Sequence, residues 1–142
     1  MAVNWRTDYA IRLLYELAKQ GPGVRDTVRH TAELAEVPYD YARTIARDMV
    51  NAELLRSRRG VGGGIELARP ADEITILDIF NAMGEPPSLS LCTQGRACHR
   101  SSACQIHTAV WCELDELVGN HLASSTLGAA VRRAMEPELI TV

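Results

Sequence analysis

The segment that most restricts the fold is a run of four glycines within the five residues 60–64. On either side of it, residues 54–58 and 65–68 alternate apolar and polar side chains, as short strands with one buried face do. Glycine adopts the backbone conformations of tight turns at little steric cost, so the sequence predicts a β-hairpin closed by residues 59–64. The run contains neither a Walker pattern nor a GxGxxG placed between a strand and a helix, and nucleotide binding is therefore not expected.

Segments with the apolar spacing of amphipathic helices surround the hairpin. Three lie before it, over residues 8–18, 28–36 and 39–52, and three lie after it, over residues 74–83, 103–123 and 127–135. Three helices followed by a hairpin are the order of elements in a winged helix-turn-helix, whose third helix enters the major groove of DNA. The expected fold class is therefore mostly α with a small β-hairpin, a winged helix-turn-helix domain plus a long dimerisation helix.

The segment 103–123 has too many apolar positions for a single helix washed by solvent on a small domain. The simplest partner for it is the same helix of a second copy, because two-fold dimers are the commonest oligomers. A chain of 142 residues holds one core and an appendage rather than two ordinary domains. We therefore divide it into a DNA-binding domain with a supporting helix over 1–83, a cysteine-rich loop over 84–104, and dimerisation and C-terminal helices over 105–142.

The net charge of −3 is distributed unevenly along the chain. Residues 1–70 hold 11 Lys and Arg against 9 Asp and Glu, whereas residues 71–142 hold 4 against 9, which favours a basic working surface in the first half. Charged side chains within the first 20 residues argue against a secretory signal, and no apolar run reaches the roughly 20 residues of a membrane helix. We expect a cytoplasmic protein with no membrane partner, in a compartment where structural disulfides are rare.

The predicted third helix carries a polar face opposite its apolar positions. The side chains on this face that could reach base edges or phosphates are Tyr39, Asp40, Arg43, Thr44 and Arg47. The predicted hairpin adds a second set, Arg56, Arg58 and Arg59 together with Gly62 and Gly63. A narrow turn with adjacent guanidinium groups suits the minor groove or its flanking phosphates. The alternative is a helix face that is merely solvated.

Cys92, Cys98 and Cys104 follow one another at intervals of six residues in the predicted loop, and His107 comes three residues after the last. Structural zinc sites usually begin with ligands only two to four residues apart. Wider intervals suit an iron–sulfur cluster, whose larger core needs thiolates from several directions. Zinc binding, a thiol redox switch and ordinary thiols are the alternatives. We interpret Cys112, in the long helical segment, as a packing residue.

Several motifs together resemble those of one protein family. They are residues 7–12, 58–64, 74–79 and 125–127 and the three-cysteine loop. The chain resembles the Rrf-type family of winged-helix transcription regulators, which includes the iron–sulfur cluster regulator IscR and the nitric-oxide sensor NsrR. The resemblance implies a homodimer that binds a roughly palindromic double-stranded DNA operator and holds one cluster, 2Fe-2S or 4Fe-4S, in each subunit. Cluster state would then set the affinity for DNA.

By this resemblance, Cys92, Cys98 and Cys104 match three cluster thiolates, and two residues compete for the fourth position. His107 matches the IscR-like pattern, whereas Asp8 of the partner subunit matches the NsrR-like pattern. If the long helix has begun by Cys104, His107 shares a helical face with it and can converge on the same core, so we favour His107.

The function expected is that of a transcription regulator that senses nitric oxide, redox state or iron–sulfur status. We favour a repressor. We expect no enzymatic turnover and no small-molecule substrate. The alternatives are a zinc- or thiol-controlled DNA-binding regulator and a small electron-transfer protein, which would have no need of an arginine-rich hairpin. The nuclearity of the cluster and the direction of its effect on DNA binding stay open at this point.

Overall fold

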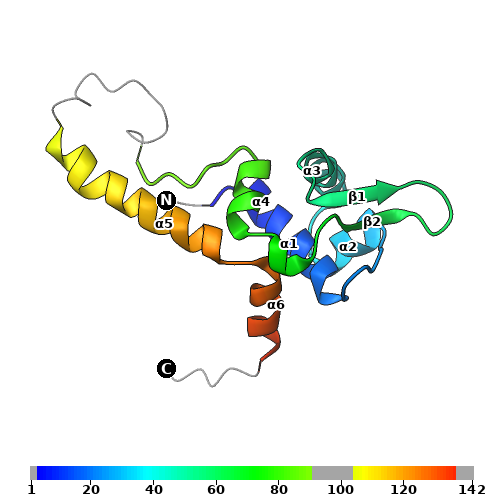
Figure 1. Cartoon of the computed structure of the whole chain (residues 1–142). Helices are drawn as coiled ribbons and strands as arrows, with labels where there is room; N and C mark the ends of the chain where they lie inside the picture. Colours follow the sequence, from blue (N-terminus) through cyan, green and yellow to red (C-terminus); the bar gives the residue numbers. More distant parts are fainter. Residues whose placement is uncertain (1–2, 91–103, 137–142) are drawn as a thin grey trace.

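The structure is a computed structural model that describes residues 3–90 and 104–136. It is mostly helical with one antiparallel hairpin (Figure 1), which confirms the predicted fold class. The elements in chain order are α1 (Trp5–Lys19), α2 (Val28–Leu34), α3 (Tyr39–Asn51), β1 (Leu55–Arg58), β2 (Gly64–Leu67), a 3₁₀ turn η1 (Ala71–Glu73), α4 (Ile76–Ala82), a π-helical segment η2 (His107–Cys112), α5 (Glu113–Ser124) and α6 (Leu127–Met135).

Local capping explains where these helices begin. The Thr27 hydroxyl accepts a hydrogen bond from the backbone N–H of His30 at 3.1 Å and starts α2 where the sequence predicts it. Thr75 and Asp78 form a reciprocal capping box at the start of α4. The first helix begins at Trp5, three residues earlier than predicted, because Asn4 accepts from the backbone N–H of Arg6 and acts as its N-cap.

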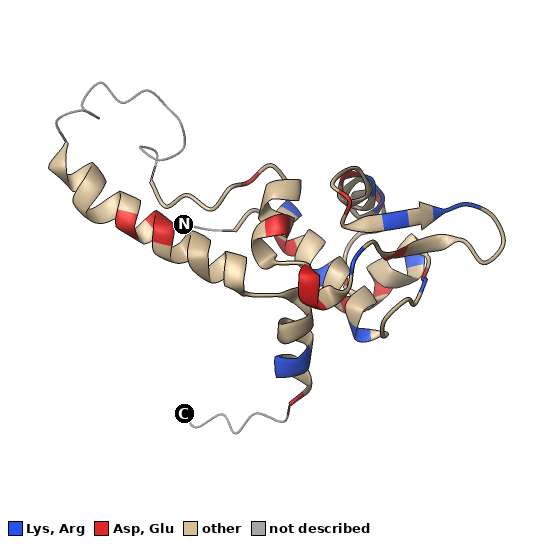
Figure 2. Ribbon diagram, viewed as in Figure 1, with Lys and Arg blue, Asp and Glu red and all other residues tan. Residues whose placement is uncertain are grey.

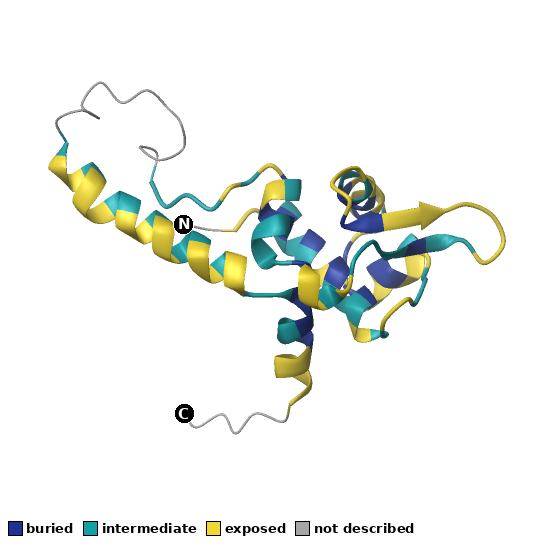
Figure 3. Ribbon diagram, viewed as in Figure 1, coloured by how far each residue is buried: buried dark blue, intermediate teal, exposed yellow. Residues whose placement is uncertain are grey.

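The core forms around α1, which packs against α2, α3, α4, α6 and β2. Its most buried large side chains are Leu13, Leu14 and Leu17, each at most 2 % exposed. Ile45 and Met49 of α3 pack on them, and Leu127 brings α6 into the same cluster. Because α3 buries one face here, its opposite face is held outward, and Figure 3 shows that outer face exposed.

The segment formed by η2 and α5 extends away from this core (Figures 1 and 3), and none of its residues is buried. Its C-terminal end is fixed where Ile76 N–H donates to the Ser125 carbonyl and Leu127 N–H donates to the Ile74 carbonyl, each at 2.8 Å. The sequence predicts one regular helix over 103–123, but residues 107–112 are π-helical. A single π turn of this kind inserts a residue into the helical repeat and is frequently found at functional sites. Within the described ranges, no helix is long and apolar enough to cross a membrane.

Candidate functional site

The exposed face of α3 carries the predicted DNA-reading residues. Asp40, Arg43, Thr44 and Arg47 are exposed and Tyr39 is half-buried. The opposite face is held in the core by a second set of residues, Ala42, Ile45, Ala46 and Met49. The polar side chains therefore share one outward surface, as their spacing predicts.

Tyr39 at the start of α3 contacts two arginines, Arg29 of α2 and Arg43 of α3. The guanidinium carbon of Arg29 lies 4.1 Å from the centre of the Tyr39 ring, and that of Arg43 lies 5.7 Å from it. Both distances allow a cation–π attraction that orders the side chains. Arg29 is not among the residues that the sequence predicts for this surface. Its approach to Tyr39 depends on how α2 crosses α3, and no spacing within one helix encodes that crossing.

The hairpin presents the second predicted set. Leu55 pairs with Leu67 and Arg58 with Gly64 at the two ends of the ladder, while Arg56, Arg58 and Arg59 are exposed. Gly62 has φ 72°, a left-handed conformation that suits glycine. A Cβ atom on Gly63 would overlap the carbonyl oxygen of Arg58. The structure therefore gives both glycines a role in shaping the turn, and direct DNA contact by either stays a prediction.

Strand β2 of the hairpin is attached to the α1–α2 loop at Asp26. The Asp26 N–H donates to the Ile65 carbonyl at 3.0 Å, and the Ile65 N–H donates back at 2.7 Å. The Asp26 carboxylate accepts from Gln20 and from the Thr27 N–H, each at 2.8 Å, and lies 2.7 Å from His30 Nδ1. Burial works to raise the pKa of Asp26, but these hydrogen bonds outweigh it and lower the pKa below its usual 3.8.

Unpaired positive charge collects on this side of the molecule. In the described part of the chain, seven arginines form no ion pair with an acidic side chain. All but one belong to α2, α3, β1 or the hairpin turn, and the seven are Arg29, Arg43, Arg47, Arg56, Arg58, Arg59 and Arg133. Figure 2 shows blue segments on α3, β1 and the hairpin loop, and red segments on α5. The charge asymmetry of the sequence is thus also an asymmetry in space.

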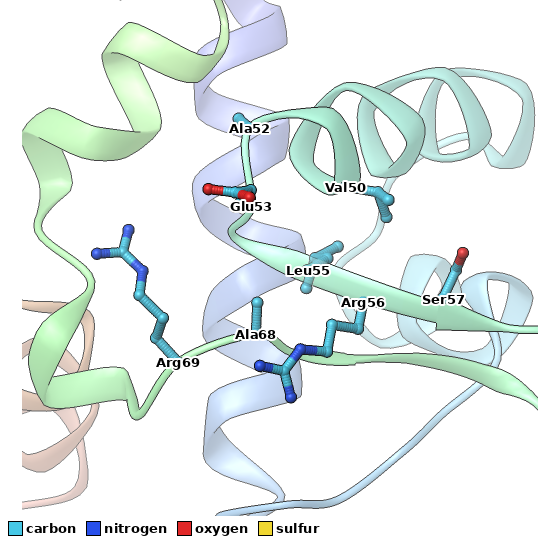
Figure 4. A pocket seen from close by; sticks show the side chains of 8 residues that line it. All are labelled: Val50, Ala52, Glu53, Leu55, Arg56, Ser57, Ala68 and Arg69. Carbon is cyan, nitrogen blue, oxygen red and sulfur yellow. The ribbon is translucent and has the colours of Figure 1, made fainter.

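A shallow hollow of about 780 Å³ lies at the base of the hairpin (Figure 4). Its lining comes from the end of α3, from β1 and from the residues that follow β2, and consists of Val50, Ala52, Glu53, Leu55, Arg56, Ser57, Ala68 and Arg69. The described residues that line it include no cysteine or histidine, and the one carboxylate among them, Glu53, is exposed. We assign no ligand to this hollow.

The predicted cluster ligands are only partly within the described residues. Cys92 and Cys98 lie outside them, while Cys104 is a half-buried free thiol at the start of the helical segment. The His107 N–H donates to the Cys104 carbonyl at 3.2 Å, so the two residues lie on one helical turn. His107 Nε2 lies 3.5 Å from Cys112 Sγ. Cys112 is half-buried and in contact with His107, in addition to any packing role.

The described donor atoms fit an iron–sulfur cluster. His107 Nδ1 is buried and has no hydrogen-bond partner among the described residues, which leaves a ring nitrogen available to a metal. The neighbouring Cys104 supplies a free thiol, and thiolate with imidazole is a known ligand combination for such clusters. Residues 3–90 and 104–136 alone contain no group of three potential ligands, so the ligand set as a whole stays a prediction.

Asp8, the alternative fourth ligand, lies in the first turn of α1, where its charge complements the helix dipole. Its carboxylate forms an ion pair with Arg12 at 2.9 Å, and both side chains are nearly half exposed. On the same part of α1, Trp5 packs edge-on against Tyr9 and against Tyr41 of α3. Asp8 is therefore accessible, and its role as a ligand to the cluster of a partner subunit stays a prediction.

Comparison with known proteins gives one consistent assignment. A model of the Rrf2 family, described as an iron-dependent transcriptional regulator, matches residues 3–133. A protein of Azotobacter vinelandii named as a candidate HTH-type transcriptional regulator, ORF2, is 23 % identical over 140 residues, which are 99 % of this chain and 85 % of that protein.

Solved structures share the same fold. CymR of B. subtilis, described as the global cysteine regulator, has a TM-score of 0.76 at 22 % identity, covering 94 % of this chain and 98 % of that one. IscR of T. potens has a TM-score of 0.74 at 21 % identity, covering 100 % of this chain and 94 % of that one.

Proposed function

The chain belongs to the Rrf2 family of transcriptional regulators, and on that premise we propose that it is a homodimeric repressor whose affinity for a DNA operator is controlled by an iron–sulfur cluster. We place its action in the cytoplasm, where the operator is accessible. In this proposal residues 1–83 bind DNA, residues 84–104 hold the cluster and residues 105–142 form the dimer.

The observation that carries the DNA-binding part is the surface of six unpaired arginines on α2, α3, β1 and the hairpin turn. We call it the arginine surface; it consists of Arg29, Arg43, Arg47, Arg56, Arg58 and Arg59. An exposed arginine without an acidic partner is free to neutralise a phosphate and release its counterion. We propose that α3 enters the major groove, where Arg43 and Arg47 read base edges, and that the hairpin lies along phosphates of the adjacent minor groove.

The dimer is supported by an apolar stripe along η2 and α5. Ile106, Val110, Leu114 and Leu117 are between 38 and 62 % exposed and recur at helical spacing on one face. Exposed apolar side chains in one continuous row indicate an interaction surface. We propose that the same stripe of a second copy covers it, which places two α3 helices for the two halves of an operator.

The cluster would be held by Cys92, Cys98 and Cys104, with His107 as the fourth ligand. When bound, the cluster can exchange electrons and react with small oxidants or nitric oxide. The available Nδ1 of His107 and the free thiol of Cys104 support this assignment. A second candidate is a thiol switch, which the 3.5 Å contact between His107 and Cys112 favours, because an imidazole beside a thiol is common around reactive cysteines.

The test begins with protein purified without oxygen. Iron, acid-labile sulfide and zinc are quantified, and the visible spectrum is recorded. We expect iron and sulfide with a brown colour that is lost in the Cys92→Ala, Cys98→Ala and Cys104→Ala proteins and kept in the matched Cys112→Ala control. One zinc per subunit without sulfide would overturn the cluster assignment. A colourless, metal-free protein whose DNA binding responds to thiol oxidants would favour the thiol switch.

DNA binding is tested with an operator selected from random double-stranded DNA. The affinity is then measured for protein with its cluster and for protein from which the cluster has been removed. We expect the two affinities to differ by at least about tenfold, a coupling of the usual size for a regulatory ligand. Equal affinities would remove the cluster from the regulatory role while leaving DNA binding intact.

A further inference from the structure

Arg25, in the loop between α1 and α2, makes two contacts with the hairpin. Its Nη2 donates to Glu66 Oε2 on β2 at 2.8 Å, and its Nη1 donates to the Gly62 carbonyl in the turn at 3.3 Å. The two contacts are 37 and 41 residues away in sequence and join the loop to both the strand and the turn. A single planar guanidinium can make both because its donors form a rigid fork.

The orientation of Arg25 differs from that of the arginine surface. Its Nε is buried and has no hydrogen-bond partner among the described residues, and its side chain is only 25 % exposed, so the guanidinium faces the hairpin rather than solvent. The arginines of the arginine surface are exposed and have no acidic partner in the part of the chain that the structure describes. Arg25 is therefore poorly placed to contact a phosphate directly.

Glu66 is the one acidic residue in the hairpin segment 54–68, and it lies opposite Arg56 in the ladder. A directly opposed pair on one face of two strands is close enough for an ion pair. Glu66 nevertheless pairs with Arg25, and Arg56 has no acidic partner within residues 3–90 and 104–136. Arg25 thus occupies the carboxylate that would otherwise neutralise one of the hairpin arginines.

The turn itself needs an external support. An isolated two-stranded hairpin is marginally stable in water, and glycine loses more conformational entropy on ordering than any other residue. The hairpin ladder has four residue pairs, and its turn contains Gly60, Gly62 and Gly63. The contact of Arg25 with the Gly62 carbonyl holds the turn at Gly62.

We propose that Arg25 is a positioning residue for DNA binding, which clamps the turn through Gly62 and holds Glu66 away from Arg56, so that the hairpin arginines are fixed and unpaired when they meet the DNA backbone. This proposal rests on the proposed DNA-binding function. It gives Arg25 an effect on affinity without a phosphate contact of its own.

The test compares Arg25→Gln with two reference variants. Arg58→Gln removes an arginine of the arginine surface. Arg132→Gln removes an ion-paired arginine outside it, because Arg132 of α6 pairs with Asp72 of η1. Operator affinity and its dependence on salt are measured for the full-length protein, and circular dichroism verifies folding. We expect Arg25→Gln to weaken binding about tenfold, as loss of a charge-assisted contact predicts, and Arg132→Gln to leave binding unchanged.

The double variant Arg25→Gln/Glu66→Gln separates positioning from contact. If Arg25 acts through Glu66, the Glu66 carboxylate becomes free to pair with Arg56 in Arg25→Gln, and removing that carboxylate restores part of the operator affinity. Glu66→Gln should therefore raise the affinity more in the Arg25→Gln protein than in the wild type. Arg25→Lys keeps the charge but loses the two-pronged geometry, and we expect it to remain weaker than wild type. Hydrogen exchange at the Gly63 and Ile65 amides should accelerate in Arg25→Gln.

Three results would overturn the proposal. The first is an unchanged operator affinity in Arg25→Gln, and the second is wild-type operator affinity in Arg25→Lys. The third is strictly additive effects of Arg25→Gln and Glu66→Gln on affinity, accompanied by a decrease of about one in the salt slope, which marks a phosphate contact. Failure of the proposed function has a different signature, because then the wild-type protein selects no operator and Arg58→Gln changes nothing. In that case the Arg25 proposal falls with it.

Discussion

The buried hydroxyl of Thr7 donates a hydrogen bond to the carboxylate of Glu85, 78 residues along the chain. Glu85 also accepts from the Asn4 N–H at 3.1 Å, so it fixes the first turn of α1. The same turn carries Arg6, which forms an ion pair with Asp48 of α3. A continuous set of contacts therefore connects the start of the cysteine-rich segment 84–104 with the helix that we place in the major groove.

This connection predicts a measurable coupling between Thr7 and Glu85. Thr7→Val keeps the shape of the side chain but removes the donor, and we expect it to lower the free energy of unfolding by about 1 to 2 kcal/mol. Urea unfolding of Thr7→Val, Glu85→Gln and the double variant checks this. The double variant should lose less than the sum of the single losses, whereas strict additivity would show that the two side chains do not act on each other.

Asp26 predicts an acid-dependent contribution to stability. Its folded-state pKa is depressed, so the contribution is fully present above the unfolded pKa of 3.8 and is lost as the pH falls through the lower folded-state pKa. We expect Asp26→Asn to be less stable than wild type at neutral pH, with the difference shrinking below about pH 4. Thermal unfolding from pH 7 to pH 3 measures this, and a difference that is constant with pH would contradict it.

Local patterns in the sequence predict most elements, because helices and hairpins depend on periodicity, caps and glycine. Residues 28 and 39 begin helices in the structure as the sequence predicts. How the elements pack against one another is harder to predict from the sequence. Arg25 contacts Gly62, 37 residues along the chain, and Arg29 contacts Tyr39 of the next helix. No local spacing encodes either contact. The π-helical turn at His107 likewise breaks the regular period on which helix prediction depends.

The dimer proposal predicts that one charge on α5 separates the subunits. Leu117 is 59 % exposed, so Leu117→Asp should leave the isolated chain folded while placing a charge in the apolar stripe. Sedimentation velocity should then show a monomer. Leu34→Asp is the matched control, because Leu34 is 44 % exposed but lies on α2, and it should remain dimeric. A Leu117→Asp protein that remained a dimer would locate the interface elsewhere.

The arginine surface predicts two kinds of DNA-binding defect. Arg58→Gln and Arg59→Gln should weaken all sequences similarly and each reduce the salt slope by about one, because they would remove phosphate contacts. Arg43→Gln or Arg47→Gln should relax one operator position by about 1 to 3 kcal/mol. Arg133→Gln is the control, since Arg133 is also exposed and forms no ion pair with a described residue, but lies on α6. Equal effects of Arg133→Gln and Arg58→Gln would refute the assigned surface.

The fourth cluster ligand is decided between His107 and Asp8. His107 lies on the same helical turn as Cys104, and its buried Nδ1 lacks a partner among the described residues. Asp8 already has a partner, because its carboxylate pairs with Arg12 at 2.9 Å and complements the N-terminal end of α1. Binding a metal through Asp8 would break that ion pair, although an exposed pair contributes little stability and would oppose the change only weakly.

We therefore expect His107→Ala to shift the visible spectrum and speed cluster loss in air, and Asp8→Ala to leave both nearly unchanged. The Cys112→Ala protein controls for the loss of the His107 contact with Cys112, since a spectral shift in it would mean that the helix around His107 had been disturbed. The three proteins are prepared without oxygen and compared side by side. An unshifted cluster spectrum in His107→Ala together with a shifted one in Asp8→Ala would reverse the assignment and make a carboxylate of the partner subunit the fourth ligand. Because Asp8 lies on α1, and α1 packs against α3, the cluster would then lie next to the contacts that hold the proposed DNA-reading helix.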